Sequence, residues 1–575
     1  MRSLFRLSIL ALLSSVAFGC DDGVGENEEN ATEVLQEGSP AALSVLALVN
    51  DPATTAATLK DAKVTSTTAK AIFKHRDGAD GVVRSGDEDL YDTVAELDAI
   101  KGVGPATLKN LKAQAEKLGY LEAQERKERH VIFSPQPADQ SHNVEVARII
   151  REAKTSIDIA MYSYSDAGIQ AALADAVKRG VKVRMVFETA SQDRKLTGSA
   201  LTASKSGKLE AIGVDVRWVN KIMHHKFMIV DGPRDDAKAA ETATVVSGSG
   251  NWSSGAATKY DENTLFLTAY PELALRTQRE FNLMWDHAKD LVAVASVTSE
   301  PSSLEITDDL IVEDPGIHAF YTSNNFSVNG TTFTISGSNT IADELVRAIE
   351  AAEERIHIAS GHLRSRPVAE ALMAKRASDP EIDIVLYLDG QEYVSDSTND
   401  LQKSDKAACV AAATTENQKQ KCLDKDYLYG RDVELAGIDV RYKYYAYRWD
   451  TSYAAQMHNK FLIVDDALYT GSYNLSDNAE HNTFENMLRF SGPEFADLVE
   501  DYETRFQELR AQGEGLLPGL TSKIDADATI PIVFPAMSLS WTEIRDLKSL
   551  IAAECPKVNS LDFRQNASAH LTCTK

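Results

Sequence analysis

The chain has 575 residues, 43% of them hydrophobic and 25% charged, which is enough for several domains with full-sized cores. This composition excludes an intrinsically disordered protein and a small disulfide scaffold. Because 60 Lys and Arg stand against 86 Asp and Glu, the net charge is −26 and the average field of the molecule repels nucleic acid and anionic lipid. Any anionic partner must therefore bind at a local basic patch.

The first twenty residues have the pattern of a secretion signal. Arg2 and Arg6 precede an apolar run that closes on small residues and is too short for a membrane span. Ala17-Phe18-Gly19-Cys20 resembles a bacterial lipobox, and this resemblance implies that Cys20 is lipidated, with ordinary cleavage nearby as the alternative. We therefore expect a protein that is secreted across the inner membrane and is lipid-anchored in the bacterial cell envelope or extracellular.

An acidic segment follows, and the cysteines are few. Residues 21–42 carry seven acidic side chains and no basic one, which predicts a flexible tether. Without Cys20, four cysteines remain, an even number that suits an oxidising compartment. Cys409–Cys422 and Cys555–Cys573 are the simplest of three possible connectivities, and free thiols are the alternative. We expect the first pair to close a surface loop.

Residues 43–121 alternate helical patterns with short breaks, which predicts a small all-α module. Its clearest unit has Gly102 and Gly104 between two amphipathic helices. A tight turn there leaves free N–H groups at the start of the second helix, and such groups can receive a phosphate. A packing module that only supports its neighbours is the alternative.

The glycine turn is similar to a helix-hairpin-helix motif, and the whole segment resembles the tandem module of DNA-uptake proteins. Four lysines and one glutamate lie between positions 101 and 120, a local positive patch of the kind that binds nucleic-acid backbones. The resemblance implies DNA binding by Gly102, Gly104, Lys101 and Lys109. The upstream hairpin at 62–65 lacks the glycines, which argues against phosphate binding there.

From residue 130 onward the chain repeats an α/β unit. Each copy has a strand pattern, a helical pattern with apolar residues three or four apart, and a second strand pattern. These segments are 156–162, 169–179 and 181–187 in the first copy, and 355–359, 368–376 and 382–388 in the second. Strand, helix and strand in this order favour a mixed or parallel sheet with helices on both faces.

Both copies then reach the same polar signature, H-x-K with an Asp five positions later, followed by G-S-x-N and then by E-N. Its members are His224, Lys226, Asp231, Ser249, Asn251 and Glu262 in the first copy, and His458, Lys460, Asp465, Ser472, Asn474 and Glu485 in the second. This pair of signatures is similar to the duplicated motif of the phospholipase D superfamily, and especially to its nuclease and cardiolipin-hydrolase branch. The resemblance covers about residues 131–509.

The resemblance implies an α/β fold of two pseudo-symmetric, phospholipase D-like mixed-sheet halves, preceded by the small all-α module. We expect a monomer. The predicted order is a signal peptide at 1–20, the acidic tether at 21–42, the helical module at 43–121, the first half at 130–290, an acidic linker at 291–315, the second half at 316–510, and a C-terminal appendage at 511–575.

Two copies of a histidine and a lysine suit phosphodiester chemistry. Residues two apart on a strand share a face, so His224 with Lys226 and His458 with Lys460 can surround one phosphate. The lysines, together with the Ser and Asn of each signature, would stabilise charge on the non-bridging oxygens. The protein itself supplies the positive charge, so neither a metal nor another cofactor is expected. His225 points to the opposite face, and we expect a structural role for it.

The superfamily resemblance implies a role for each group. One neutral histidine attacks phosphorus while the other, protonated, donates to the leaving oxygen, and water then cleaves the phosphohistidine. His224 is expected to be the nucleophile and His458 the acid and base, with the reverse assignment open. Glu262 and Glu485 are expected to orient the imidazoles, and Asp231 and Asp465 to support the site.

The substrate has two candidate classes. A segment of aromatic and basic residues at 441–453 precedes His458 and fits base stacking, a lipid head-group cage, or an edge strand packed on the other half. A phospholipase D that releases phospholipid head groups is the first hypothesis, because the tether and lipid anchor hold it at a bilayer. A metal-independent endonuclease that holds DNA on the helical module is the second. A non-catalytic, tethered DNA-binding protein is the third.

Overall fold

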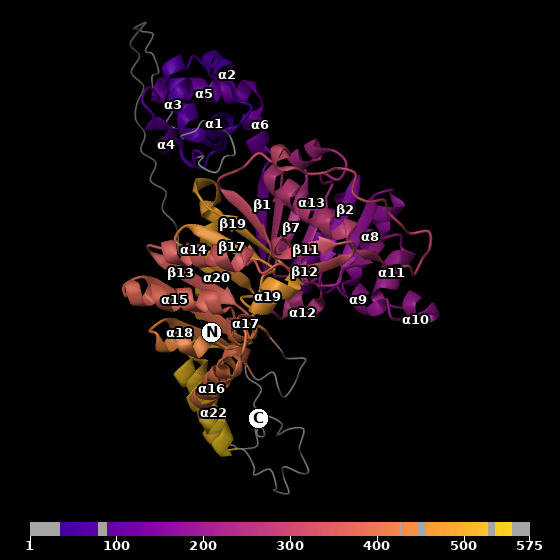
Figure 1. Cartoon of the computed structure of the whole chain (residues 1–575), viewed down its shortest axis with the longest axis vertical. Helices are drawn as coiled ribbons and strands as arrows, with labels where there is room; N and C mark the ends of the chain where they lie inside the picture. The colour runs from indigo at the N-terminus through magenta and orange to yellow at the C-terminus, as the bar shows by residue number, and fades with distance from the viewer. Residues whose placement is uncertain (1–34, 79–88, 426, 446–454, 527–534, 555–575) are drawn as a thin grey trace, which may run out of the picture. The chain divides into compact units, whose positions relative to one another are not determined.

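The computed structural model describes residues 35–78, 89–425, 427–445, 455–526 and 535–554 (Figure 1). The predicted signal peptide, Cys20 and most of the acidic tether lie outside these ranges, as do the predicted pair Cys555–Cys573 and most of the aromatic segment before His458. Within the described part of the chain, no helix is both long and apolar enough to cross a bilayer.

The N-terminal module is helical, as predicted, and is slightly wider than 43–121. Leu48, Leu59, Ile72, Leu97 and Leu111 are fully buried and form its core. Its described helices are α1 (Pro40–Asn50), α2 (Ala56–Asp61), α3 (Ser66–Arg76), α4 (Val94–Asp98), α5 (Pro105–Lys117) and α6 (Tyr120–Glu125).

Each of the two hairpins of this module has a residue with positive φ two positions before the N-cap of its second helix, although only the second hairpin contains glycines. Lys63, between α2 and α3, has a φ of 57°, and Gly102, between α4 and α5, has a φ of 96°. Thr65 and Gly104 then occupy the N-cap positions of α3 and α5. Left-handed backbone costs a lysine about 1–2 kcal/mol, so the upstream turn forms at an energetic cost that the second turn avoids.

The first half is built on a mixed sheet with the strand order β1-β8-β7-β6-β2-β3-β4-β9. Strands β2, β3 and β4 are parallel, and the other neighbours are antiparallel. The strands are β1 (Glu128–Ser134), β2 (Ser156–Met161), β3 (Lys182–Phe187), β4 (Asp215–Trp218), β6 (Lys226–Val230), β7 (Thr244–Gly248), β8 (Glu262–Thr268) and β9 (Lys289–Asp290), while β5 (Ile222–Met223) lies outside this sheet.

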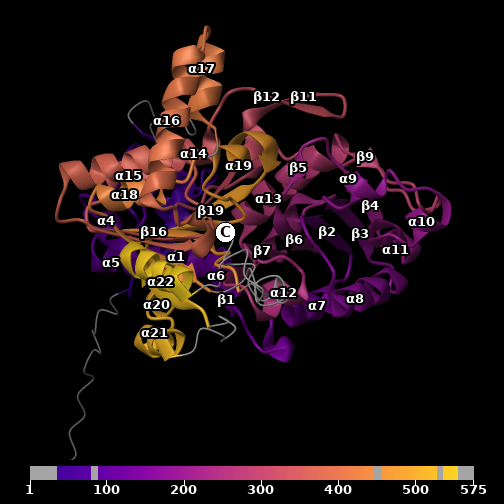
Figure 2. The ribbon, with the colours of Figure 1, turned by 90° about the horizontal axis from the view of Figure 1, so that it is seen from below.

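Helices cover both faces of this sheet (Figure 2). Helices α7 (His142–Glu152) and α8 (Ala167–Lys178) pack on one face with α11 (Lys205–Ala211), and α13 (Pro271–Asp286) packs on the other. The short helices are α9 (Ala190–Asp193), α10 (Gly198–Thr202) and α12 (Ser254–Thr258), with single 3-10 turns η1 (Ala138–Gln140) and η2 (Ala237–Glu241).

The second half repeats the arrangement with the strand order β10-β19-β17-β16-β13-β14-β15-β20. Position for position, β10 corresponds to β1 and β13 to β2, so the predicted pair of pseudo-symmetric mixed sheets is confirmed. The strands are β10 (Ile317–Tyr321), β13 (Arg355–Ser360), β14 (Asp383–Asp389), β15 (Asp439–Tyr444), β16 (Lys460–Val464), β17 (Ala467–Gly471), β19 (Asn486–Phe490) and β20 (Met537–Ser540).

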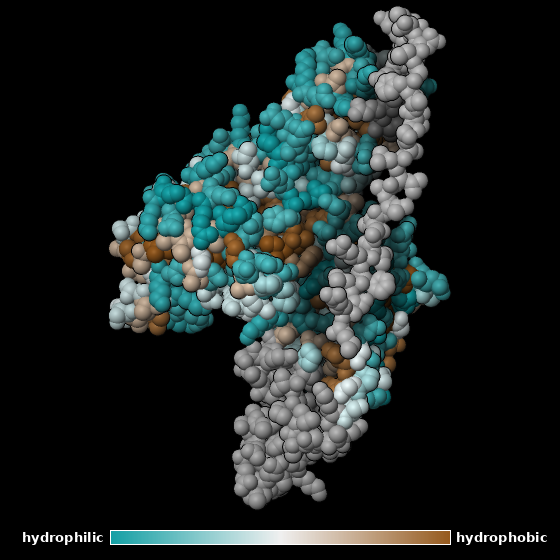
Figure 3. All heavy atoms as spheres, turned by 180° about the vertical axis from the view of Figure 1, so that it is seen from behind, coloured by the Kyte–Doolittle hydropathy of each residue, from teal (hydrophilic) through white to brown (hydrophobic). Residues whose placement is uncertain are grey.

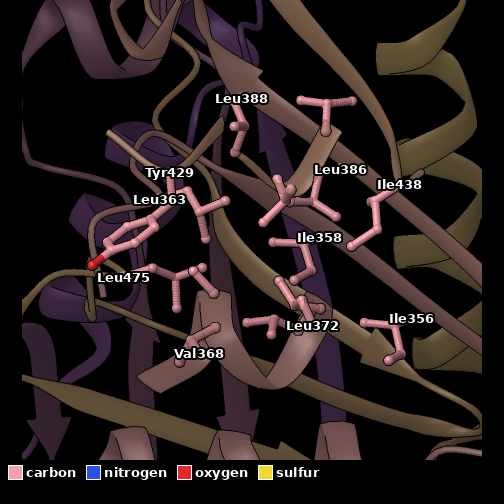
Figure 4. Packing of buried hydrophobic residues seen from close by; sticks show 14 of the residues in the cluster. Ile356, Ile358, Leu363, Val368, Leu372, Leu386, Leu388, Tyr429, Ile438 and Leu475 are labelled. Atoms are coloured by element: carbon pink, nitrogen blue, oxygen red, sulfur yellow. The ribbon is translucent and has the colours of Figure 1, made fainter. Parts of the chain in front are cut away.

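Helices again cover both faces of the second sheet. Helices α14 (Thr340–Ala351) and α15 (Arg366–Ser378) pack on one face, where Ile356, Ile358, Leu372 and Leu386 interdigitate (Figure 4). Helix α20 (Ala496–Arg510) packs on the other face. The remaining elements are β11 (Phe326–Asn329), β12 (Thr332–Ile335), β18 (Thr483–Phe484), α16 (Asp396–Ala412), α17 (Glu416–Leu423), α18 (Gly430–Leu435), α19 (Asp477–Asn482), α21 (Leu516–Ala526), α22 (Trp541–Glu554), η3 (Asp308–Leu310), η4 (Thr322–Asn325), η5 (Gly390–Glu392) and η7 (Pro493–Phe495).

Three segments differ from the sequence predictions. Residues 511–575 are not only an appendage, because β20 pairs with β15 and takes the place in the second sheet that β9 takes in the first. The expected acidic linker packs against both halves, with Ile306 and Ile311 buried. The loop around the confirmed disulfide Cys409–Cys422 is a pair of helices, α16 and α17.

Hydrophilic side chains dominate the described surface in the view of Figure 3, as the charge of −26 leads one to expect. Acidic residues of the 291–315 segment are nonetheless paired with cations. Asp308 lies 2.5 Å from Arg279, and Asp314 lies 3.2 Å from Lys127. The net charge of this segment is therefore partly compensated where the halves meet.

Candidate active site

The two halves are joined by backbone hydrogen bonds at equivalent places. Strand β5 of the first half pairs in parallel with β18 of the second, and Asp261 forms the equivalent bridge with Met457. As a result, the His224 N–H donates to the Phe484 carbonyl at 3.1 Å, and the His458 N–H donates to the Asp261 carbonyl at 3.0 Å. Each signature histidine is thus fixed to the residue that precedes the signature glutamate of the other half.

The glutamates pair with the histidines across the two halves. His224 Nδ1 lies 2.9 Å from a carboxylate oxygen of Glu485, and His458 Nδ1 lies 2.8 Å from Glu262 Oε1. Both carboxylates are at most 1% exposed. Because a carboxylate accepts, the proton of each neutral imidazole resides on Nδ1 and the lone pair on Nε2. Each half therefore supplies the carboxylate that orients the signature histidine of the other half.

The lysine of each signature lies against its own histidine, as the two-residue spacing requires. Lys226 Nζ is 3.2 Å from His224 Nε2 and donates to the His224 carbonyl at 2.7 Å. Lys460 Nζ is 3.4 Å from His458 Nε2 and donates to the His458 carbonyl at 2.7 Å. The ammonium groups thus lie beside both reactive nitrogens, where they can neutralise a bound phosphate.

Burial weakens the basicity of these four groups. It lowers the pKa of Lys226 to about 7 and of Lys460 to about 8. Burial, and then the charges of the two lysines, lower the pKa of His224 well below its usual value. Burial likewise lowers the pKa of His458 to about 4, against the opposing effect of Glu262. A phosphodiester anion would supply the negative charge that restores protons to this site.

The two glutamates differ in their electrostatics. Burial raises the pKa of Glu485 to about 7. Burial alone would raise the pKa of Glu262. The charge and the hydrogen bond of His458 have a larger effect in the opposite direction, so the pKa of Glu262 is lowered. An ionised Glu262 favours a protonated His458, whereas His224 has the less acidic partner and the stronger tendency to be neutral.

The signature serines face the glutamates and the strand backbone. Ser472 donates to Glu485 at 2.7 Å and accepts from the Asn486 N–H at 3.0 Å. Ser249 accepts from the Asn263 N–H at 2.9 Å, and its hydroxyl helps to lower the pKa of Glu262. Both serines are fully buried. These contacts correct the prediction that the serines hold phosphate oxygens, because their single O–H donors are already used.

The signature asparagines and aspartates separate into two groups. Asn251 and Asn474 are half-buried, and each leaves its buried side-chain carbonyl oxygen without a hydrogen-bond partner. Asp231 accepts the N–H groups of residues 154–156, and Asp465 accepts those of residues 353–355, at the starts of β2 and β13. Each asparagine thus has an unpaired acceptor oxygen, while the aspartates hold the starts of the strands β2 and β13.

A family model described as "Cardiolipin synthase, PLD-like domain" matches residues 146–285 and 345–510, which is just over half of the chain. The chain belongs to this phospholipase D-like family. Both matched segments contain one complete signature, so both halves of the site described above are phospholipase D-like halves.

The similar proteins each match about a quarter of this chain. Mitochondrial cardiolipin hydrolases of Danio rerio and Homo sapiens are 34% and 28% identical over 137 and 152 residues. These matches span 23% and 26% of this chain and 52% and 53% of theirs, so the chain spans about half the length of the curated relatives it matches. A solved phospholipase D family member, NUC from Salmonella typhimurium, is 31% identical, with 28% of this chain and 97% of that chain covered and a TM-score of 0.23.

An aromatic side chain that sequence reasoning missed covers one histidine of the phospholipase D-like site. The Tyr162 ring meets the His224 ring edge-on with centroids 4.6 Å apart, and Lys226 Nζ lies 5.3 Å from the Tyr162 centroid. The register Met161↔Lys226 and Ser360↔Lys460 makes Gly361 the equivalent of Tyr162 in the second half. Within the described part of the chain, the His458 side chain is more exposed than that of His224, at 21% against 11%.

Buried polar contacts between the phospholipase D-like halves were also missed. Lys443 donates to Asp261 at 2.6 Å, with both side chains at most 1% exposed, and Asn263 donates to Asn459 Oδ1 at 3.0 Å. A signal was available, because Asp261 and Asn263 flank Glu262 in a hydrophobic strand. His225 is fully buried against Glu280 at 3.1 Å, in agreement with its predicted structural role.

The DNA-binding candidates lie in the helical module and not among the site residues. Helix α5 begins after Gly104 with no side-chain cap, and a Cβ on Gly104 would meet open space. Lys101 and Lys109 are exposed on either side of this helix start. By contrast, Thr65 caps α3 by accepting from the Thr68 N–H at 3.2 Å. The second hairpin alone thus offers uncapped N–H groups, as the glycines predict.

We expect the crossed pairing to appear as an energetic coupling between the halves. Removing His224 (His224→Ala) and removing the charge of its partner (Glu485→Gln) should be non-additive in the free energy of unfolding, by about 0.5–3 kcal/mol. The matched control combines His224→Ala with Glu262→Gln, which do not contact each other, and should show a smaller coupling. Unfolding in denaturant measures both cycles, and a coupling found only in the control pair would contradict the crossed geometry.

The lysine pKa values predict a loss of substrate capture at alkaline pH. Lys226 and Lys460 are charged below their pKa values of about 7 and about 8, so rising pH removes the charges that attract an anionic phosphodiester. We therefore expect kcat/KM to fall above about pH 7, because this ratio reports the free enzyme. The kcat should fall less, since bound phosphate keeps the lysines protonated. A kcat/KM that stays level up to about pH 10 would contradict this assignment.

Proposed function

We propose that this protein hydrolyses a phosphodiester P–O bond in two steps through a phosphohistidine. The observation that carries the proposal is the crossed pair of buried His–Glu contacts, each with a lysine on the imidazole. Such a site offers two imidazoles with different partners around one anion, which is what a nucleophile and a separate acid require.

The electrostatic asymmetry supports His224 as the nucleophile. In the first step, the lone pair of His224 Nε2 forms a bond to phosphorus, and the leaving oxygen takes a proton from His458 as its bond to phosphorus breaks. In the second step, neutral His458 takes a proton from water, the water oxygen attacks phosphorus, and the P–N bond to His224 breaks. The lysines and the amide N–H groups of Asn251 and Asn474 would donate to the phosphoryl oxygens throughout.

The first substrate class is a membrane phospholipid, from which the reaction would release the head group. The family description and the names of the cardiolipin hydrolase relatives support a lipid phosphodiester. The expected lipid anchor at Cys20 would also keep the site beside a bilayer, where such a substrate is concentrated.

The second substrate class is DNA, and one feature of the helical module favours it. The uncapped start of α5, with Lys101 and Lys109 exposed beside it, can receive a backbone phosphate. A catalytic unit on the same chain would then cut the bound strand. The completeness of both His–Lys–Glu sets argues for an enzyme over a purely DNA-binding protein.

The two classes can be separated with one set of proteins. The chain without its first twenty residues is assayed in EDTA on phosphatidylcholine, cardiolipin and plasmid DNA, with His224→Ala and His458→Ala as inactive references. We expect hydrolysis without added metal, lost in both variants, and a phosphohistidine trapped by acid quench from wild type alone. Activity that needs a metal, or that survives both substitutions, would contradict the proposed two-step mechanism.

Surface variants of the module decide the role of DNA. Lys101→Glu with Lys109→Glu should abolish DNA binding and leave lipid hydrolysis intact if the module selects DNA. Lys60→Glu with Lys70→Glu, which are exposed lysines of the capped hairpin, are the matched control. Equal DNA affinity of both double variants would contradict DNA binding at the start of α5.

We also propose export and lipid anchoring through Cys20. The lipobox-like sequence before this cysteine supports it. When the full chain is expressed in a bacterium, we expect it in the membrane fraction with a diacylglyceryl group on Cys20, detected by mass spectrometry. Cys20→Ser should shift it to the soluble fraction, and an unchanged membrane fraction would contradict the anchor.

A further inference from the structure

A carboxylate at the end of a strand holds the main chain just before each catalytic histidine. In the first half, Glu188, which follows β3, accepts the Met223 N–H at 2.8 Å. In the second half, Asp389, the last residue of β14, accepts the Met457 N–H at the same distance of 2.8 Å. Strands β3 and β14 occupy equivalent positions in the two sheets, so the contact is duplicated with the fold.

The contact persists although the two halves differ between its partners. In the first half 35 residues separate the carboxylate from the N–H that it accepts, and in the second half 68 residues do, because α16 and α17 are inserted there. The acid also differs, since Glu188 and Asp389 have side chains of different length. A hydrogen bond that is kept across both differences points to a requirement of the site and not to chance.

Each histidine is thereby held by three equivalent contacts. Its own N–H binds a carbonyl of the other half, its own carbonyl accepts the lysine two residues later, and the preceding N–H binds the carboxylate. The first two contacts involve groups of the site itself. The third comes from a residue that touches no reacting atom and belongs to neither signature.

Burial disfavours the ionised form of both carboxyl groups. Burial raises the pKa of Glu188, and it raises the pKa of Asp389 to about 6. Asp389 is 3% exposed, and its Oδ2 also accepts from the Tyr445 hydroxyl at 3.1 Å. A neutral acceptor would satisfy the same N–H without the cost of burying a charge.

We propose that Glu188 and Asp389 are equivalent positioning residues, which fix the main chain of His224 and His458 so that one imidazole reaches the phosphorus and the other reaches the leaving oxygen. This inference rests on the proposed two-step hydrolysis. A misplacement of about 1 Å can reduce a rate by about 100-fold, so a small backbone shift at Met223 or Met457 is enough to matter.

The test compares Glu188→Ala and Asp389→Ala with the isosteres Glu188→Gln and Asp389→Asn. We expect the alanine variants to lower kcat by about 10- to 100-fold with little change in KM, and the amides to restore most of it because an amide oxygen still accepts the N–H. Glu210→Ala is the matched control, since Glu210 accepts the N–H groups of Ala293 and Val294 at 2.7 Å away from the signatures.

Substrates with different leaving groups distinguish the effect of Asp389 from that of Glu188. If His458 is the acid, Asp389→Ala should lose less on a nitrophenyl phosphodiester, whose leaving group needs no proton, than on an alkyl diester. Glu188→Ala should lose equally on both. The reversed pattern would support the positioning role and exchange the roles of the histidines. Alanine variants that keep wild-type kcat, or lose it only in proportion to melting temperature as Glu210→Ala does, would overturn the proposal.

A second measurement does not depend on turnover. Carbethoxylation of His224 and His458, followed by mass spectrometry, reports how each imidazole is held. We expect Glu188→Ala to accelerate modification of His224 only, and Asp389→Ala that of His458 only. If wild type cleaves no diester, the proposed function fails, while these rates still decide the positioning role. Unchanged rates in both variants would refute it.

Discussion

The contact on which the site depends is the hydrogen bond from each histidine to a glutamate of the opposite half. It is short, buried and charged, so its geometry tolerates little displacement of one sheet against the other. The parallel pairing of β5 with β18 and the bridge between Asp261 and Met457 lie directly beside these contacts. The Lys443–Asp261 ion pair and the Asn263–Asn459 hydrogen bond are further polar contacts between the two halves. The halves are therefore fixed to each other where the chemistry takes place.

This arrangement also explains how a strongly acidic chain can bind an anion. The basic groups of the site are few, and burial is the first cause of their lowered pKa values, because it removes the water that would otherwise stabilise their charges. A phosphate anion would supply a compensating negative charge. The proposed selection for anions would thus come from a local arrangement of two lysines and two histidines, and the net charge of −26 would have little bearing on it.

Much of the fold and site was accessible from the sequence because it depends on local periodicity. The two-residue spacing of His224 and Lys226 places them together, and the strand, helix and strand patterns at 156–187 predict β2, α8 and β3. The crossed partners were not accessible, since nothing in the spacing of Glu262 and Glu485 indicates which histidine each one meets. Glu188 and Asp389 were missed for the same reason, because they meet their N–H groups only through the tertiary fold. The serines were misassigned because their hydroxyl direction depends on the turn after β7 and β17.

The second sheet can be completed only late in synthesis, because its edge strand β20 lies far after the other strands in the chain. In the first half the edge position is filled by β9, three residues after α13 ends, so that sheet is complete as soon as its own segment has emerged. In the second half β15 remains an open edge until residues 537–540 arrive, almost a hundred residues later. An unpaired edge can recruit other strands, and β20 removes the edge of β15 from such contacts once the two strands have paired. A chain that crosses a membrane from its N-terminus would therefore protect its second sheet last.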